Sequence, residues 1–272
     1  MRTLVIALIV LAAAALAPRP GTAQASPCHA FVQTNPDVGL IRAGLQRANA
    51  GSEVAIRFVG HSTFRIRTPG DVIIATDYAG NAGAGPVPDV VTMNHAHHTH
   101  YTRTPNPKID HVLRGWNPAG DGPAKHDLTV GDVRIRNVPT NIRGRGNTVE
   151  PDGNSIFVFE AADLCIAHLG HLHHKLTDRD RALLGRVDVV FAPVDGIYTL
   201  NLSEMTDVLT RLGASLVLPM HVFSGQSLRR FLAGARSAFD VRIAAESPIT
   251  VSRRTLPREP TILVPKSLAA QR

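Results

Sequence analysis

Histidines concentrate in two short windows of this sequence. The chain has thirteen histidines, and eight of them are His95, His97, His98, His100, His168, His171, His173 and His174. Neutral imidazole is a good ligand for zinc and other first-row ions, and a metal site needs several donors on short, converging loops. Eight histidines in two windows therefore favour a metal site over a histidine-rich surface tract or a chance scatter.

Each histidine window directly follows a segment that we expect to be a strand. The strands expected before the windows are Val90–Met93 and Leu164–Ala167, and His221 follows a third apolar run, Leu216–Leu218, with its closing proline. The C-terminal ends of strands are where α/β folds gather their sites. His95 and His97 are two residues apart, so in an extended segment both rings would face one side and grip one ion. We expect His98, His173 and His174 to be ordinary surface residues.

The rest of the chain supplies strands first and helices later. Glycine-bearing turns separate further expected strands at Val54–Val59, Thr63–Ile66, Val72–Thr76, His111–Arg114, Leu128–Val130, Val133–Val138 and Ser155–Phe159. Capping residues and apolar spacing predict helices from Thr177 to Gly185, over Leu202–Leu212 and over Leu228–Ala238, with a short one near Gly39–Ala48. Val187–Ala192 is a further buried run. This order predicts two packed β layers with helices outside.

The first 25 residues resemble a secretory signal. Leu4 to Ala17 contains no polar residue, Arg2 precedes it, and Ala23-Gln24-Ala25 follows it. Fourteen apolar residues are too few for a bilayer span, which needs roughly 20. We expect cleavage after Ala25, a secreted or periplasmic protein, and a single domain over residues 26–272 with a short N-terminal extension. An uncleaved membrane anchor is the alternative.

Composition narrows the functional classes. With 44% apolar and 19% charged residues, the chain is neither disordered nor a coiled coil. The net charge is +7, but the arginines are scattered and aromatic residues are few, so we expect no nucleic-acid partner. Cys28 and Cys165 permit a disulfide after export, although Cys165 also fits a simple buried side chain.

Several segments together resemble the metallo-β-lactamase fold superfamily, and within it the branch with ascorbate-phosphate lactonase-like hydrolases. The residues that carry this resemblance are Phe58–Phe64, Thr76–Tyr78, His95–His100, His168–His171, Val187–Pro193 and Pro219–His221, in the family order. The resemblance implies a four-layer αββα sandwich of α/β class, with a metal site in the cleft between the sheets.

The resemblance also implies a ligand set. His95, His97 and His168 match the ligands of a first ion, and His100 and His221 match ligands of a second. Two positions depart from the pattern: Thr99 and His171 stand where the family has aspartates, so His171 is expected as a terminal ligand or proton carrier. Two dications about 3.5 Å apart repel by about 19 kcal/mol at an effective dielectric of about 20. Without those carboxylates, we expect one tightly held ion and a second that is weak or absent.

We therefore expect an exported metal-dependent hydrolase that acts on a small molecule. Zinc is the expected ion, with manganese or iron possible, and a metal-bound hydroxide would attack an ester, lactone, amide or phosphodiester. The alternative is a protein of the same fold that binds metal or ligand without turnover, because both family aspartates are absent. The substrate and the oligomeric state do not follow from the sequence.

Overall fold

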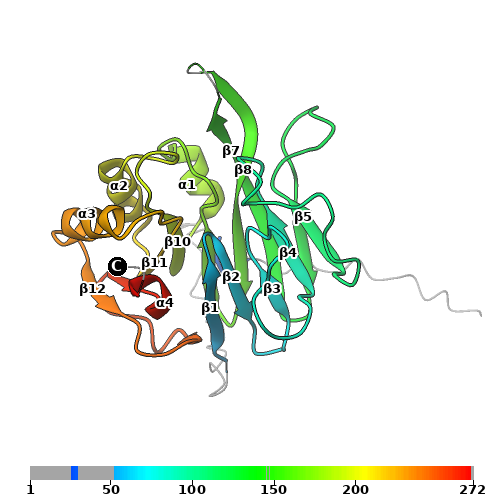
Figure 1. Ribbon diagram of the computed structural model, residues 1–272. Coiled ribbons are helices and arrows are strands. Elements are labelled where there is room, and N and C mark those ends of the chain that lie inside the picture. Colours follow the sequence, from blue (N-terminus) through cyan, green and yellow to red (C-terminus); the bar gives the residue numbers. More distant parts are fainter. Residues whose placement is uncertain (1–25, 30–51, 145, 147, 271–272) are drawn as a thin grey trace, which may run out of the picture.

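The strands form two mixed sheets that face one another (Figure 1). The computed structural model describes residues 26–29, 52–144, 146 and 148–270. The smaller sheet has the order β13-β1-β2-β3-β4-β5. Its strands are β1 (Val54–Gly60), β2 (Thr63–Arg67), β3 (Ile73–Ala75), β4 (Val90–Met93), β5 (His111–Arg114) and β13 (Ile249–Val251).

The larger sheet has the order β12-β14-β11-β10-β9-β8-β7-β6. Its strands are β6 (Asp127–Val130), β7 (Val133–Arg143), β8 (Val149–Ala161), β9 (Leu164–His168), β10 (Val189–Pro193), β11 (Leu216–Met220), β12 (Asp240–Ile243) and β14 (Thr261–Val264). Strands β9, β10 and β11 run parallel and are buried along their whole length, as their continuous apolar sequences predict.

One hydrophobic core joins the two sheets. Phe64 of β2 stacks on Phe191 of β10 with ring centroids 4.2 Å apart, and both side chains are fully buried. A second, smaller cluster contains Met93 of β4 and Ile109, with Tyr101 and Trp116 packed against it. Loop residues that follow β4 and β5 therefore cover part of the smaller sheet.

The helices are α1 (Asp178–Leu184), α2 (Leu202–Leu212), α3 (Gly225–Ala235) and α4 (Lys266–Ala269). Two of the helices, α1 and α2, begin and end where their capping residues predict. Thr177 and Asp180 form a capping box at α1, and Asn201 caps α2, which ends at a left-handed Gly213. Helices α1, α2 and α3 lie on the side of the larger sheet away from β1 and β2 (Figure 1).

These elements confirm the predicted α/β sandwich and most of its strands. The helix expected over Leu228–Ala238 instead begins at Gly225, because Ser224 caps it, and ends at Ala235. Strands β12, β13 and β14 were not predicted. The helix expected near Gly39–Ala48 and the predicted signal lie outside the described residues. Within the described part of the chain, no helix is long and apolar enough to cross a membrane.

A disulfide ties the N-terminal segment to the larger sheet. Cys28 is bonded to Cys165 of β9, with Cα atoms 5.9 Å apart. The Cys28 carbonyl also accepts a hydrogen bond from the Arg186 amide at 2.9 Å. Of the two possibilities left open by the sequence, the structure has the bridge.

Candidate metal centre

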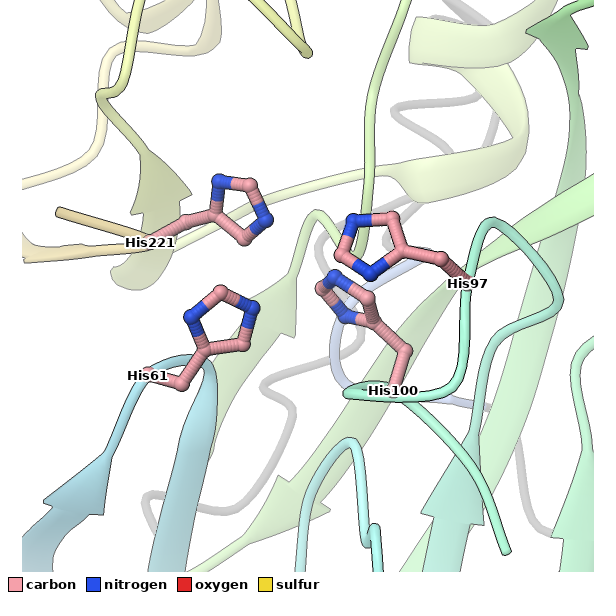
Figure 2. A group of neighbouring side chains, drawn as sticks. All are labelled: His61, His97, His100 and His221. Atoms are coloured by element: carbon pink, nitrogen blue, oxygen red, sulfur yellow. The ribbon is translucent and has the colours of Figure 1, made fainter. Parts of the chain in front are cut away.

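Four histidines converge from three loops at one end of the sandwich. His61 follows β1, His97 and His100 lie in the loop after β4, and His221 directly follows β11. Figure 2 shows the four rings turned toward one another. One ligand nitrogen from each ring lies within 4.8 Å of every other, so both sheets contribute to one candidate metal centre.

Unusual backbone conformations aim two of these rings. His61 and His221 have φ angles of 51° and 55°, in the left-handed region that non-glycine residues seldom adopt. The His221 amide donates to the His61 carbonyl at 2.8 Å, which joins the two strained loops across the sheets. Strain of this kind persists only where surrounding contacts enforce it and is common at functional sites.

Carboxylates hold the two fully buried rings from behind. His100 Nδ1 lies 2.8 Å from Asp77 Oδ2, and His221 Nδ1 lies 2.9 Å from Asp195 Oδ2. An ionised carboxylate only accepts, so each Nδ1 carries the proton and each Nε2 is left with a lone pair. Both Nε2 atoms are buried and have no hydrogen-bond partner among the described residues. A carboxylate behind an imidazole whose other nitrogen is free is the arrangement that orients metal-ligating histidines.

Both carboxylates stay ionised despite their burial. Burial alone raises the pKa of Asp77, but electrostatic interactions with His100 and His168 and hydrogen bonds from His100 and Asn94 outweigh it and lower that pKa. Burial likewise opposes ionisation of Asp195, and hydrogen bonds from His221 and Thr199 lower its pKa well below the usual range. A fixed negative charge therefore lies behind His100 and another behind His221, each on the carboxylate bonded to Nδ1.

Thr99 joins the other two rings. Its hydroxyl oxygen lies 3.0 Å from His61 Nε2 and 2.7 Å from His97 Nδ1. A hydroxyl can accept two hydrogen bonds, so Thr99 can hold both rings with their remaining nitrogens free of protons. Burial, and then repulsion from neighbouring histidines, lowers the pKa of His61 to about 3 and of His97 to about 4. Both rings are neutral at pH 7, as metal binding requires.

A chain of hydrogen bonds leads from the backbone to His97. The Arg143 amide donates to His173 Nδ1 at 2.6 Å, so the His173 proton lies on Nε2, which contacts His171 Nδ1. His171 then carries its proton on Nε2, 3.1 Å from His97 Nε2. Burial, followed by repulsion from His100 and His221, holds the pKa of His171 far below its usual range. His171 is thus a neutral donor to His97 Nε2, and an ion bound at that nitrogen would replace this hydrogen bond. His173 supports His171 instead of being an ordinary surface residue.

Two of the six predicted ligands turn away from this centre. The partially exposed His95 ring stacks on Trp116 at 5.1 Å, and its Nδ1 lies 2.8 Å from Glu150 Oε1. His168 is buried with both nitrogens in use: Nε2 donates to the Ser62 carbonyl at 2.9 Å, and Nδ1 accepts from the Gly170 amide. The predicted trio of His95, His97 and His168 is therefore not brought together, whereas His97, His100, His171 and His221 are.

His61 is the member of the cluster that the sequence analysis did not single out as a ligand. It stands alone between Gly60 and Ser62 and has no neighbouring histidine in the sequence to form a spacing pattern. The signal available in the sequence was its place in Phe58–Phe64, one of the segments that resemble the metallo-β-lactamase fold superfamily.

The donor set suits one first-row ion. Zinc–nitrogen bonds of 2.0–2.1 Å allow two opposed ligand atoms to be at most about 4.2 Å apart. The four nitrogens lie within 4.8 Å of one another, so the rings would have to move closer together to surround an ion. Two lone pairs buried without donors, each backed by a carboxylate, are otherwise costly to leave unsatisfied. The residues present therefore fit a metal.

Fold and centre together define a metallo-hydrolase sandwich, and sequence comparison agrees. A family model described as the beta-lactamase superfamily domain matches residues 55–221, so the chain belongs to this superfamily. A UPF0173 protein of Pyrococcus furiosus is 24% identical over 186 residues, which are 61% of this chain and 82% of that protein.

Solved structures show the same fold. A Thermotoga maritima protein assigned as a Zn-dependent hydrolase of the metallo-β-lactamase superfamily is 25% identical, with a TM-score of 0.57, covering 78% of this chain and 98% of that one. YhfI from Bacillus subtilis, a metallo-β-lactamase fold protein, is 13% identical, with a TM-score of 0.51 and coverage of 78% and 96%. The resemblance inferred from the sequence motifs is confirmed.

Proposed function

We propose that this protein is an exported metal-dependent hydrolase with one divalent ion held by His61, His97, His100 and His221. The buried, unpartnered Nε2 atoms of His100 and His221, each with a carboxylate on Nδ1, carry the proposal. Zinc, the preferred ion, would lower the pKa of a bound water to about 7 and polarise a carbonyl or phosphoryl oxygen; manganese and iron are the alternatives.

The protein's own residues prepare and orient this site. Asp77 and Asp195 keep the protons of His100 and His221 on Nδ1. Thr99 orients His61 and His97, and an ion on His97 Nε2 would displace the His171 Nε2–H that contacts this nitrogen. Because its pKa is so low, His171 remains neutral at pH 7, which argues against the expected role as a proton carrier. Substrates fitting this chemistry are small esters, lactones, amides or phosphodiesters.

A stoichiometry of one ion follows from the same geometry. His95 and His168, which a second site would need, are bonded to Glu150 and to backbone groups. The four-histidine group also contains no carboxylate among the described residues, so no bridging anion offsets the repulsion of a second dication.

That missing carboxylate also supports a second candidate function, metal or ligand binding without turnover. Asp77 and Asp195 bond to the far side of their histidines and cannot act as a base on a water beside the ion. The two candidates share the metal centre and differ only in chemistry.

Metal analysis and a substrate panel on one preparation separate the candidates. Zinc-loaded protein is analysed by plasma mass spectrometry and assayed with an aryl ester, a lactone, an anilide and bis(p-nitrophenyl) phosphate. We expect one zinc per chain, with turnover of at least one substrate that falls about 100-fold or more in His221→Ala. The control is His98→Ala, which changes an exposed histidine in the loop after β4. One zinc without turnover favours the binding protein, and failure to retain zinc, manganese or iron would contradict the metal centre on which both candidates rest.

Export is part of the proposal and has separate support. The Cys28–Cys165 disulfide suits an oxidising compartment, because cytosolic thiols are kept reduced. The predicted signal ends just before Ser26, whose hydroxyl donates to Glu160 at 2.8 Å. Mass spectrometry of the native protein should find a mature N-terminus at Ser26, and a cytoplasmic protein with residues 1–25 retained would contradict export.

A further inference from the structure

Three large apolar side chains are exposed beside the metal centre. Ile197, Tyr198 and Phe223 are 74%, 58% and 57% exposed. The Phe223 ring lies 4.8 Å from the His221 ring and 5.5 Å from the His61 ring, and the Tyr198 ring lies 5.4 Å from Phe223. We call these three residues the apolar wall. Phe223 is the member that contacts two of the four clustered histidines.

Backbone hydrogen bonds hold the loop that carries two of the three wall residues, Ile197 and Tyr198. Asp195 Oδ1 accepts hydrogen bonds from the amides of Ile197, Tyr198 and Thr199. Arg143 Nη2 donates to the carbonyls of the same three residues at 3.1 to 3.4 Å. Backbone bonds on both sides therefore hold Ile197 and Tyr198 outward.

The wall and the metal centre share a support. Asp195 organises the loop through Oδ1, and its Oδ2 binds His221 Nδ1. A substrate group bound beside His221 would therefore lie at a fixed position relative to Tyr198 and Phe223. Clustered apolar side chains held exposed next to polar groups are characteristic of ligand-binding surfaces.

We propose that the apolar wall binds the acyl chain of the substrate, so that the site selects carboxylic esters with an extended apolar acyl group. This inference rests on the proposed hydrolase function and assigns its substrate class. Each methylene group removed from water on the wall should raise kcat/KM by roughly two- to fourfold, the upper value being that of complete burial.

A series of p-nitrophenyl esters from acetate to octanoate tests this assignment on the zinc-loaded protein. We expect kcat/KM to rise with each methylene and the octanoate-to-acetate ratio to fall at least about tenfold in Tyr198→Ala and in Phe223→Ala. Ile243→Ala removes an exposed apolar side chain on β12, outside the wall, and should keep the ratio of the wild type. Hydrolysis of all esters at equal kcat/KM, or an equal loss of the ratio in Ile243→Ala, would overturn the assignment while leaving the hydrolase intact.

Calorimetry with the acid products separates failure of the wall from failure of the enzyme. Octanoate should bind the zinc-loaded protein at least about tenfold more tightly than acetate, and Phe223→Ala should remove most of that difference. If no ester is turned over but this preference holds, the hydrolase is wrong and the acyl-binding wall stands. Equal binding of both acids with no ester preference contradicts the wall.

Discussion

At the scale of single residues, the proton positions on the imidazoles decide what the centre can bind. Asp195 illustrates this because its two oxygens face different partners. Three backbone amides hold Oδ1, and His221 Nδ1 and the Thr199 hydroxyl hold Oδ2. An asparagine at this position has one acceptor oxygen and one donor NH2 group. The three amides need the acceptor, so the donor would face His221.

Asp195→Asn should therefore weaken metal binding. The amides fix the Asn oxygen in the Oδ1 position, so the NH2 group faces His221 Nδ1 and moves the ring proton to Nε2, where it blocks the ligand atom. We expect zinc affinity, measured by calorimetry or chelator competition, to fall by roughly 10- to 100-fold. Asp207→Asn, an exposed change on α2, should have no effect; unchanged affinity in Asp195→Asn would contradict the tautomer argument.

The lowered pKa values of His61, His97 and His173 make the metal-free protein sensitive to acid. In the unfolded chain these side chains take up protons near pH 6.5, and in the folded protein only near pH 3 to 4. Between those values the unfolded state binds more protons, so stability is fully present above about pH 6.5 and declines as pH falls toward about 4.

Urea unfolding of metal-free protein at pH 7.5, 6 and 5 should show this decline. His97→Gln removes one of the shifted groups and should reduce the slope between pH 6 and 5, whereas His98→Gln should not. The same shifts imply that zinc persists at pH values below the 6.5 expected for ordinary imidazoles, because His61 and His97 remain neutral there. An identical slope in His97→Gln and wild type would show that this ring does not contribute.

At the scale of elements, the sequence predicted strands and helices better than it predicted directions of side chains. Val90–Met93 and Leu202–Leu212 match their observed bounds, because one is a continuous apolar run and the other has caps and helical spacing. β12 is short and mostly exposed, so its sequence lacks the apolar pattern of a strand. A strand of that kind is specified by its partner β14 and not by its own residues.

The ligand set was predicted less well because it depends on loop conformation. The pairing of His95 with His97 assumed an extended segment, but residues 95–100 form bends and a turn. His95 therefore turns to Trp116 and Glu150 while His97 and His100 face the centre. His61 enters the centre only through a left-handed backbone that no local pattern shows. His100 and His221 were predicted and lie in the cluster: His221 directly follows the buried strand β11, and His100 closes the loop after β4.

His168→Gln tests whether that residue is a ligand or a connection between elements. In the structure its ring joins the end of β9 to the Ser62 loop and packs against Phe64 and Phe191. We expect the substitution to cost about 1–3 kcal/mol of unfolding free energy through lost buried hydrogen bonds, with one zinc per chain retained. His100→Gln should lose the zinc. Loss of zinc from His168→Gln in protein that remains folded would return His168 to the ligand set.

At the scale of the whole molecule, two kinds of connection hold the sandwich in register around its centre. The core joins the sheets through Phe64 and Phe191, and the His221 amide joins the loops after β11 and β1. The Cys28–Cys165 bridge adds a covalent connection across 137 residues of sequence, from the N-terminal segment to β9. β9 ends in His168, so the bridge and the site share one strand.

Removal of this bridge should destabilise the whole molecule while leaving the metal centre able to form. A long closed loop restricts the unfolded chain, and loss of such a disulfide costs about 2–5 kcal/mol. Cys28→Ala combined with Cys165→Ala should lower the unfolding free energy by that amount and the urea midpoint with it, and dithiothreitol should move the wild type to the same midpoint. The double variant should be insensitive to dithiothreitol and should still bind one zinc per chain. Equal midpoints for oxidised wild type and double variant would mean that the bridge does not stabilise the fold, and would remove one of the two supports for export.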